Sequence, residues 1–467
     1  MPTYAGLTDE THRVRAEGAS CPFVRRPTLH SITLVDVTAG HGATEVLSHT
    51  SLTIAAGSRI GVVGPDGAGK TTLLRLLAGL EEPERGRVRL TPPGLSVGYL
   101  PQELESPLSG GQARRAALAA LFRADHDVYC LDEPTNDLDF EGLEWLERLV
   151  QRTRGSVVVV SHDRAFLDRA VTTIVELEEG RHRLREWPGG WSEYEAARAR
   201  AREEQYRRFD EADERRREVE GLIRERQGQA RAHGRGAGRR GTHAQSTKVR
   251  QARRALERID RVEKPFEPWE LHLALEPASR GGDLVVRLEG AVVERGGFRL
   301  GPLDLEVRRG DRIAVTGRNG SGKSTLLAAL TGKLPLVSGC RELGAGAVVG
   351  ELEQTRERFA VEQPLVEAFG GPQEKARTLL AKFGLGADDV LRPARTLSPG
   401  ERTRAQLALF AARGVNCLVL DEPTNHLDLP AIEELEAALD GYAGTIVLVT
   451  HDRRLLDRFG ATRSIGV

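Results

Sequence analysis

The stretch GPDGAGKTT, residues 64–72, decides the fold, and a second version, GRNGSGKST, follows at residues 317–325. Each reads glycine, four residues, glycine, lysine and a hydroxyl residue, and each follows an apolar run and precedes two leucines. Glycines here let backbone N–H groups surround phosphate oxygens, the lysine reaches the β and γ phosphates, and the hydroxyl binds Mg²⁺. The sequence therefore predicts two phosphate-binding P-loops, each between a strand and a helix.

The rest of the chain repeats around these loops, with one gap. LDEPTN at residues 131–136 recurs 289 residues later, whereas the two P-loop lysines are 253 residues apart. Gln102 and Gln354 are 252 residues apart, so the first copy lacks 37 residues between Gln102 and the LSGGQ sequence at 108–112. Both copies alternate apolar strand runs with amphipathic stretches, which predicts α/β domains with parallel sheets.

Four regions follow from this pattern. We expect an N-terminal extension at 1–30, a first repeat at 31–189, a linker at 190–274 and a second repeat at 275–467. The 467 residues carry a net charge of −1 and four cysteines, too few for a disulfide framework. The N-terminus has no apolar signal segment, and no apolar run approaches the ~20 residues that span a bilayer. The expected location is cytoplasmic.

The linker is dense in Glu and Arg with spaced apolar residues, which predicts a long exposed helix from residue 193 to about 226. The glycine-rich stretch 227–241 is expected to end it, and a second helix at 244–262 would complete a hairpin. Between Arg224 and Arg258 there are eleven basic and two acidic residues, a net charge of +9.

Arginine and glycine without aromatic residues suit contact with a phosphate backbone rather than base reading. We therefore expect RNA contact, and no DNA partner, from the basic tip residues Arg231, Arg235, Arg239, Arg240, Lys248 and Arg250. A solvated, flexible tether is the alternative interpretation of such a charge run.

Candidate catalytic residues follow two apolar strands in each repeat. Asp132 and Asp421 end strands, where a carboxylate can hold Mg²⁺, and the next residues, Glu133 and Glu422, can activate water. A solvated acidic pair is the alternative, and its recurrence in the same EPTN context disfavours it. His162 and His451 each end a further β run and are interpreted as γ-phosphate contacts, although a lone histidine is more often structural.

These motifs resemble the ATP-binding cassette superfamily, whose signature is LSGGQ. Paired cassettes, EPTNHLD at 422–428 and a charged linker hairpin resemble the ABC-F proteins, which bind ribosomes and include antibiotic-resistance proteins. The resemblance implies a monomer in which the two cassettes pair head-to-tail around two ATP molecules. Lys70 and Glu133 would face the second signature, and Lys323 and Glu422 the first.

By motif and by resemblance, the candidate nucleotide residues are Gly64, Gly67, Gly69, Lys70, Thr71, Thr72, Gln102, Ser109, Gly110, Gly111, Gln112, Asp132, Gly317, Asn319, Gly320, Gly322, Lys323, Ser324, Thr325, Gln354, Ser398, Gly400, Glu401 and Asp421. The candidate Mg²⁺ ligands among them are Thr71, Ser324, Asp132 and Asp421, together with the Q-loop residues Gln102 and Gln354.

Three departures from the family pattern bear on the sites. The gap removes most of the helical subdomain of the first repeat, and we expect it to displace Ser109 and Gly111 and weaken the second repeat's site. Asp66 stands where asparagine is usual, and a carboxylate beside phosphates is unfavourable unless it is paired or faces away. LSPGE at 397–401 replaces LSGGQ in the second repeat.

The expected function is an ATPase that binds ribosomal RNA under ATP control and protects the ribosome from an antibiotic. One alternative is an ATPase subunit of a transporter with a separate membrane protein, although such partners dock on the helical subdomain that the first repeat lacks. Another is a nucleotide-dependent scaffold with weak hydrolysis, which the intact Glu133 and Glu422 disfavour.

Overall fold

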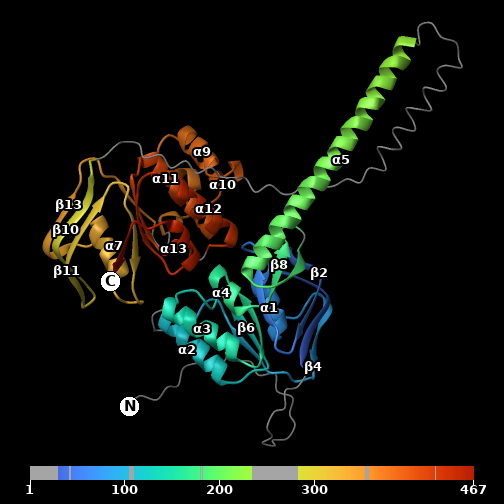
Figure 1. Cartoon of the computed structure of the whole chain (residues 1–467), viewed down its shortest axis with the longest axis horizontal. Coiled ribbons are helices and arrows are strands. Elements are labelled where there is room, and N and C mark those ends of the chain that lie inside the picture. Colours follow the sequence, from blue (N-terminus) through green and yellow to red (C-terminus); the bar gives the residue numbers. More distant parts are fainter. Residues whose placement is uncertain are drawn as a thin grey trace, which may run out of the picture. The chain divides into compact units, whose positions relative to one another are not determined.

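The computed structural model describes residues 30–41, 44–104, 110–178, 180, 182–233, 282–352, 357–425 and 427–467 (Figure 1). Contacts divide the chain into two compact units. One comprises residues 1–191 and 271–467, which include both repeats, and the other comprises residues 192–270.

The first repeat contains two sheets. The smaller is antiparallel, with strand order β2-β1-β4, and consists of β1 (Ser31–His41), β2 (Thr44–Ala55) and β4 (Arg85–Thr91). The larger has the order β5-β6-β7-β3-β8-β9 and is parallel except between its last two strands. Its strands are β3 (Arg59–Val63), β5 (Val97–Leu100), β6 (Val128–Asp132), β7 (Ser156–Val160), β8 (Thr173–Glu178) and β9 (Arg183–Pro188).

Helix α1 (Lys70–Ala78) packs between these two sheets. Four of its leucines, Leu73, Leu74, Leu76 and Leu77, are buried in one apolar cluster with residues from both sheets. The remaining helices of the repeat are α2 (Gly110–Arg123), α3 (Phe140–Arg152) and α4 (Arg164–Ala170). Because parallel strands end at the same sheet edge, the P-loop after β3, the acidic pair at the end of β6 and the histidine after β7 gather there.

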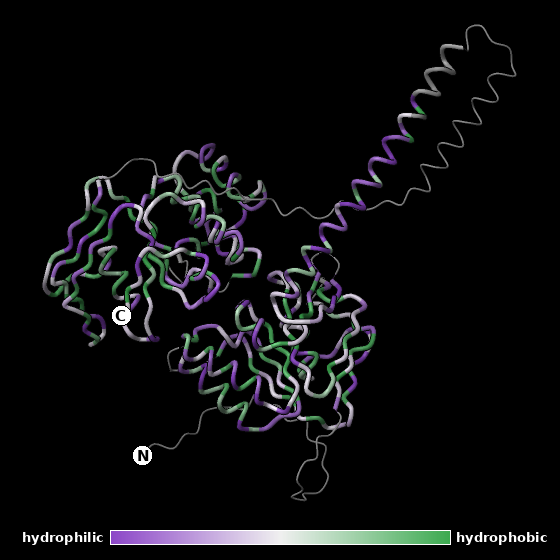
Figure 2. Tube along the Cα trace, viewed as in Figure 1, coloured by the Kyte–Doolittle hydropathy of each residue, from purple (hydrophilic) through white to green (hydrophobic). Residues whose placement is uncertain are grey.

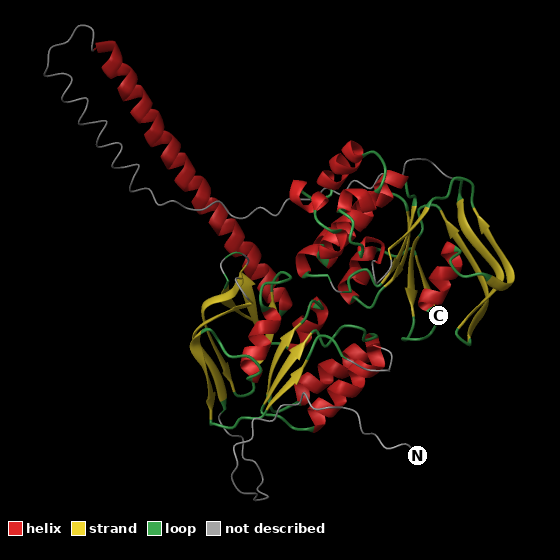
Figure 3. Ribbon diagram, turned by 180° about the vertical axis from the view of Figure 1, so that it is seen from behind, coloured by secondary structure: helices red, strands yellow, loops and turns green. Residues whose placement is uncertain are grey.

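The second repeat has the same plan (Figure 3). Its antiparallel sheet, β11-β10-β13, consists of β10 (Leu284–Arg295), β11 (Phe298–Arg308) and β13 (Leu336–Leu343). Its parallel sheet, β14-β15-β16-β12-β17, consists of β12 (Arg312–Thr316), β14 (Val349–Leu352), β15 (Cys417–Asp421), β16 (Thr445–Val449) and β17 (Arg463–Gly466).

Successive residues of β15 face opposite sides of this sheet, as the two-residue period of a strand requires. Cys417 and Val419 join the cluster around α7 (Lys323–Thr331), whereas Leu418 and Leu420 join the larger cluster with the remaining helices. Those helices include α11 (Pro399–Arg413), α12 (Leu429–Gly441) and α13 (Arg453–Phe459). The central strands β6, β7, β15 and β16 are hydrophobic runs, which is typical of sheets covered on both faces (Figure 2).

The repeats differ between the strand that precedes the Q-loop position and the signature helix. The second repeat has η1 (Glu357–Phe359), α8 (Leu365–Phe369), α9 (Gln373–Lys382), α10 (Ala387–Leu391) and η2 (Ala394–Thr396) in this interval. In the first repeat, only nine residues separate β5 from α2, and the four of these that the structure describes, 101–104, contain no helix.

The linker contains one described helix, α5 (Trp191–His233), of 43 residues. It is mostly hydrophilic (Figure 2), and Arg–Glu pairs such as Arg216 with Glu220, 3.3 Å apart, recur along it at helical spacing. The prediction that the helix ends near residue 226 is wrong, since it continues past Gly228. A single glycine costs only about 1 kcal/mol in a helix, so it does not by itself end one.

The expected second hairpin helix at 244–262 lies outside the described residues, as does almost all of the N-terminal extension. None of the helices that the structure describes is long and apolar enough to span a bilayer.

Candidate functional site

Each P-loop wraps around the N-terminus of a helix. The loop glycines have positive φ, for example 99° at Gly69 and 107° at Gly322, which glycine adopts without steric cost. Lys70 Nζ donates to the carbonyl oxygens of Gly64 and Pro65 at 2.8 and 3.0 Å. Lys323 makes the equivalent bonds to its own loop at 2.9 and 3.1 Å. Both ammonium groups are thus held inside a glycine-rich loop at the N-terminus of a helix, which suits a phosphate group.

A hydroxyl–carboxylate pair lies beside each lysine. Thr71 Oγ1 donates to Asp132 Oδ2 at 2.7 Å, and Ser324 is hydrogen-bonded to Asp421 in the same way. Burial raises the pKa of both aspartates, while the neighbouring hydroxyl and lysine lower it. These oxygens are the ligand type that Mg²⁺ prefers. Among the described residues, no group of three or more His, Cys, Asp or Glu side chains could hold a metal by itself.

The next residues, Glu133 and Glu422, have φ values of 46° and 45°. This left-handed conformation is uncommon outside glycine and concentrates at functional sites. Burial raises the pKa of Glu133 to about 8 and that of Glu422 to about 7. The Glu133 side chain is buried and that of Glu422 is mostly buried, and the backbone N–H of His451 donates to Glu422 Oε2 at 3.1 Å. The raised pKa makes each glutamate a stronger base than an exposed one, so its ionised form can take a proton from a water molecule.

The two predicted histidines lie beside these glutamates. His162 Nε2 is 3.2 Å from Glu133 Oε1, and His451 Nε2 is 3.5 Å from Glu422 Oε1 and 3.2 Å from Lys323 Nζ. Burial lowers the pKa of His162 to about 3 and that of His451 to about 4, so both rings are neutral at pH 7. A neutral ring can donate one N–H to a phosphate oxygen without adding charge.

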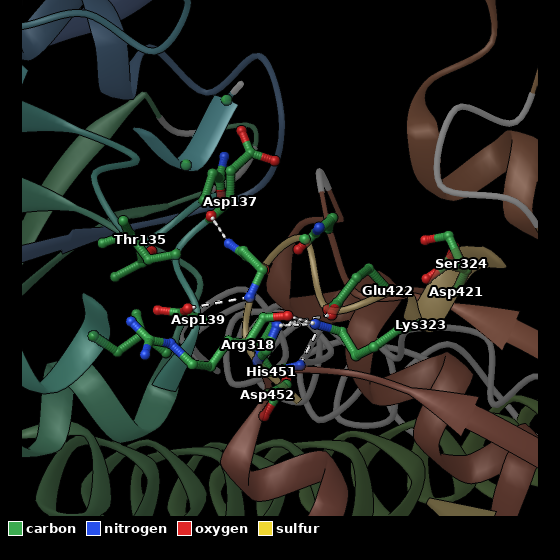
Figure 4. A pocket seen from close by; sticks show the side chains of 18 of the residues that line it. Thr135, Asp137, Asp139, Arg318, Lys323, Ser324, Asp421, Glu422, His451 and Asp452 are labelled. Carbon is green, nitrogen blue, oxygen red and sulfur yellow. Dashed lines mark hydrogen bonds and ion pairs between the residues drawn. The ribbon is translucent and has the colours of Figure 1, made fainter. Parts of the chain in front are cut away.

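Residues of both repeats line one cavity of about 740 Å³ (Figure 4). The second repeat contributes its P-loop, Asp421, Glu422 and His451, and the first contributes Gly110, Gly111 and Gln112 at the start of α2. The loop that follows β6 in the first repeat also reaches the second P-loop. Asn319 Nδ2 donates to the carbonyl of Asp137 at 2.7 Å, and the backbone N–H of Asn319 donates to Asp139 Oδ2 at 3.2 Å.

The prediction that the missing 37 residues displace Gly111 is wrong. A Cβ added to Gly111 would lie 2.9 Å from Asn319 Nδ2 and 2.5 Å from the Asp137 carbonyl, so this glycine is in close contact with the second P-loop. Arg114 of α2 explains the placement, because it donates to the carbonyls of Pro101 and Gln102 at 3.2 and 2.7 Å. Helix α2 is thereby tied to the residues that follow β5, and the helices that the second repeat has in this interval are not needed to place Gly111.

The other predicted residues are placed as follows. Gln102 is exposed, and Ser109 and Gln354 lie outside the described residues. Ser398 and Glu401 form a capping box at the start of α11, in which Ser398 N–H donates to Glu401 Oε2 at 2.7 Å. The Glu401 side chain thus bonds its own helix terminus. Arg231 is in α5 but its side chain is not described, and Arg235, Arg239, Arg240, Lys248 and Arg250 lie outside the described residues.

Several cavity residues were not predicted from sequence. Phe298 has 39% of its surface exposed, lines the cavity and lies beside Gly322, where an added Cβ would be 2.9 Å from its ring. Val46 occupies the corresponding place beside Gly69 in the first repeat. Asp137 and Asp139, which follow EPTN in the first repeat, were also missed. Asp139 recurs as Asp428, and this repetition was a signal that could have found it.

Reciprocal ion pairs also join the repeats next to the histidines. Arg164 of α4 donates to both carboxylate oxygens of Glu436 of α12, and both side chains are buried. At the equivalent positions, Arg453 of α13 donates to Glu147 of α3 at 2.6 Å. We call these two pairs the buried clasp (Arg164–Glu436) and the outer clasp (Arg453–Glu147).

Comparison with known proteins agrees with this geometry. A family model described as ABC transporter matches residues 47–106 and 300–425, and a second, also described as ABC transporter, matches 175–272. The tylosin resistance ATP-binding protein TlrC of Streptomyces fradiae is 33% identical over 90% of this chain and 95% of its own length. The ribosome protection protein VmlR of Bacillus subtilis is 30% identical over 91% and 85% of the two chains. ABC transporter F family member 5 of Arabidopsis thaliana is 28% identical over 90% and 73%. The chain therefore belongs to the ABC-F family of ATP-binding cassette proteins, and it is an ATPase.

Proposed function

We propose that this ATPase binds the ribosome under the control of ATP and protects it from an antibiotic. The observation that supports this best is the similarity to TlrC and VmlR over nearly their whole lengths, since one is named for tylosin resistance and the other for ribosome protection. The linker adds a second argument. Its 43-residue helix includes the start of the 224–258 segment, whose net charge of +9 suits contact with an RNA backbone.

The residues fit ATP with Mg²⁺ at both P-loops. The lysine, the loop N–H groups and the helix N-terminus bind the phosphates, and the open space around Gly67 and Gly320, where an added Cβ would meet nothing within 4 Å, leaves room for them. Thr71 and Asp132, or Ser324 and Asp421, would hold Mg²⁺. When bound, this ion offsets the negative charge that develops on the phosphoryl oxygens.

Glu133 and Glu422 then act as general bases toward the attacking water, and the neighbouring neutral histidines hold a γ-phosphate oxygen. The contacts of Asn319 and Gly111 link phosphate binding in one repeat to the position of the other. ATP binding would therefore stabilise the paired repeats, and hydrolysis would release them from each other and from the ribosome.

The test is a variant that binds ATP but cannot activate water. Replacing both Glu133 and Glu422 with Gln removes the base, keeps the side-chain shape and should leave the protein bound to ribosomes after ATP is added. Co-sedimentation with purified ribosomes through sucrose, with and without ATP, measures this directly. The exposed Glu367 of α8 provides a matched Glu→Gln control that should release normally. A double variant that leaves ribosomes in ATP as fast as the wild type contradicts the proposal.

A further inference from the structure

The two P-loops differ in sequence at the third position, where the first repeat has Asp66 and the second has Asn319. The backbone N–H groups of these two residues make equivalent hydrogen bonds. The N–H of Asp66 donates to Asp428 Oδ2 of the second repeat at 3.2 Å, and the N–H of Asn319 donates to Asp139 Oδ2 of the first repeat at 3.2 Å. The two positions therefore occupy equivalent places at the contact between the repeats, and a difference between them comes from their side chains.

The side chains make different contacts. Asn319 Nδ2 donates across the contact to the carbonyl of Asp137 at 2.7 Å. Asp66 Oδ1 instead lies 3.5 Å from Nζ of Lys70, the lysine of its own P-loop, whose side chain is 10% exposed. The second P-loop has an amide, Asn319, at the position of Asp66, and Lys323 Nζ lies 3.2 Å from His451 Nε2.

Two chemical consequences follow from this difference. An ionised carboxylate has no hydrogen to donate, so Asp66 cannot make the amide-to-carbonyl bond that Asn319 makes. The carboxylate also pairs with the ammonium group that a bound triphosphate requires, and it adds a negative charge close to the phosphates that the loop would hold. A triphosphate that enters the first P-loop must displace the carboxylate from Lys70 and then remain next to it.

We propose that Asp66 makes the P-loop of the first repeat the weaker of the two triphosphate sites, because it acts as an internal counter-ion to Lys70 and lacks the donor that joins the repeats at Asn319. The second site then fills and closes first. This inference rests on both P-loops binding ATP, but it does not depend on a ribosomal partner. It also reverses the ranking expected from the sequence gap, because the structure keeps Gly111 in contact with Asn319.

The chain offers a reciprocal test, in which each site receives the other's residue. In a Lys323→Ala background, which isolates the first site, Asp66→Asn should lower the dissociation constant of a non-hydrolysable ATP analogue by about fivefold, the ratio that corresponds to ~1 kcal/mol for a partly exposed charge pair. In a Lys70→Ala background, Asn319→Asp should raise the dissociation constant at the second site by a similar factor. Binding is measured on the full chain by fluorescent-nucleotide displacement.

ADP provides a control in both backgrounds, because it lacks the γ phosphate and should respond less than the triphosphate analogue to either substitution. In the otherwise wild-type chain, photolabelling with 8-azido-ATP at limiting concentration should mark peptides of the second repeat first. The proposal is overturned if Asp66→Asn leaves the affinity of the first site for the triphosphate analogue unchanged. It is also overturned if the photolabel marks peptides of the first repeat before those of the second. A wild-type chain that binds no nucleotide at either site would instead refute the ATP sites themselves.

Discussion

Replacing Arg164 with Ala should destabilise the protein much more than the same change at Arg453, although the two arginines occupy equivalent places in the repeats. In the buried clasp, the side chains of Arg164 and Glu436 are each 2% exposed. In the outer clasp, Arg453 is 15% exposed and Glu147 is 8% exposed. Both substitutions remove the arginine of an ion pair, so the difference in burial decides which one lowers the free energy of unfolding more.

The size of each loss in stability depends on the ion-pair partners that remain to the glutamate after its arginine is removed. Without Arg164, Glu436 retains Arg458, whose Nη1 is 2.8 Å away but whose side chain is 59% exposed. Leaving one buried charge without its buried partner costs about 3–5 kcal/mol. Glu147 is better hydrated and keeps Arg169 at 3.5 Å, so loss of Arg453 should cost about 1–2 kcal/mol. For a domain of this size, each 1 kcal/mol corresponds to a shift in melting temperature of about 2–4 °C.

Differential scanning calorimetry of the full chain without nucleotide measures both shifts. Arg164→Ala should lower the melting temperature by about 10 °C, and Arg453→Ala by about 4 °C. The pair Arg164→Met with Glu436→Leu, which removes both charges and keeps the volume, should recover most of the loss. Equal shifts for the two arginines, or a double variant as unstable as Arg164→Ala, would refute the argument from burial.

Three further outcomes test the sites and the linker. Burial raises the pKa of Glu133 to about 8 in the native protein, against 4.5 in the unfolded chain. The contribution of the protonated Glu133 to the free energy of unfolding is therefore complete below pH 4.5 and is lost as the pH rises through about 8. The Glu133→Gln variant should therefore match the wild type in unfolding free energy near pH 4.5 and exceed it by about 2–4 kcal/mol at pH 8.5, and a difference that does not grow with pH would contradict this assignment. In ATPase assays, Glu422→Gln alone should lower turnover more than Glu133→Gln alone, since Asp66 weakens the first site; equal losses would argue against unequal sites. Ribosome binding should fall with salt with a log–log slope of several units, and a variant with Gln at four tip positions should flatten the slope and lose antibiotic protection while it keeps its basal ATPase rate; unaltered binding across the salt series would leave the linker as a tether. The four positions are Arg231, Arg235, Arg239 and Arg240.

Much of the fold could be predicted from sequence because its determinants are contiguous. A P-loop wraps phosphates with neighbouring backbone groups, so Gly64–Lys70 and Gly317–Lys323 carry their own geometry. The strand-ending acidic pairs and the histidines were predictable for the same reason, since each follows its own apolar run. The repetition of these motifs then specified two domains of one architecture, and the structure bears this out.

The tertiary structure alone decided the features that depend on two distant segments. Sequence spacing suggested that the short connection displaces Gly111, but Arg114 ties α2 to the end of β5 and Gly111 lies beside Asn319. The pairing of Asp66 with Lys70 and the burial of Arg164 against Glu436 were likewise invisible in the motifs. A motif specifies the groups that a loop presents, whereas their pKa values and partners depend on solvent exclusion and on side chains from the other repeat, and only the packed chain sets these.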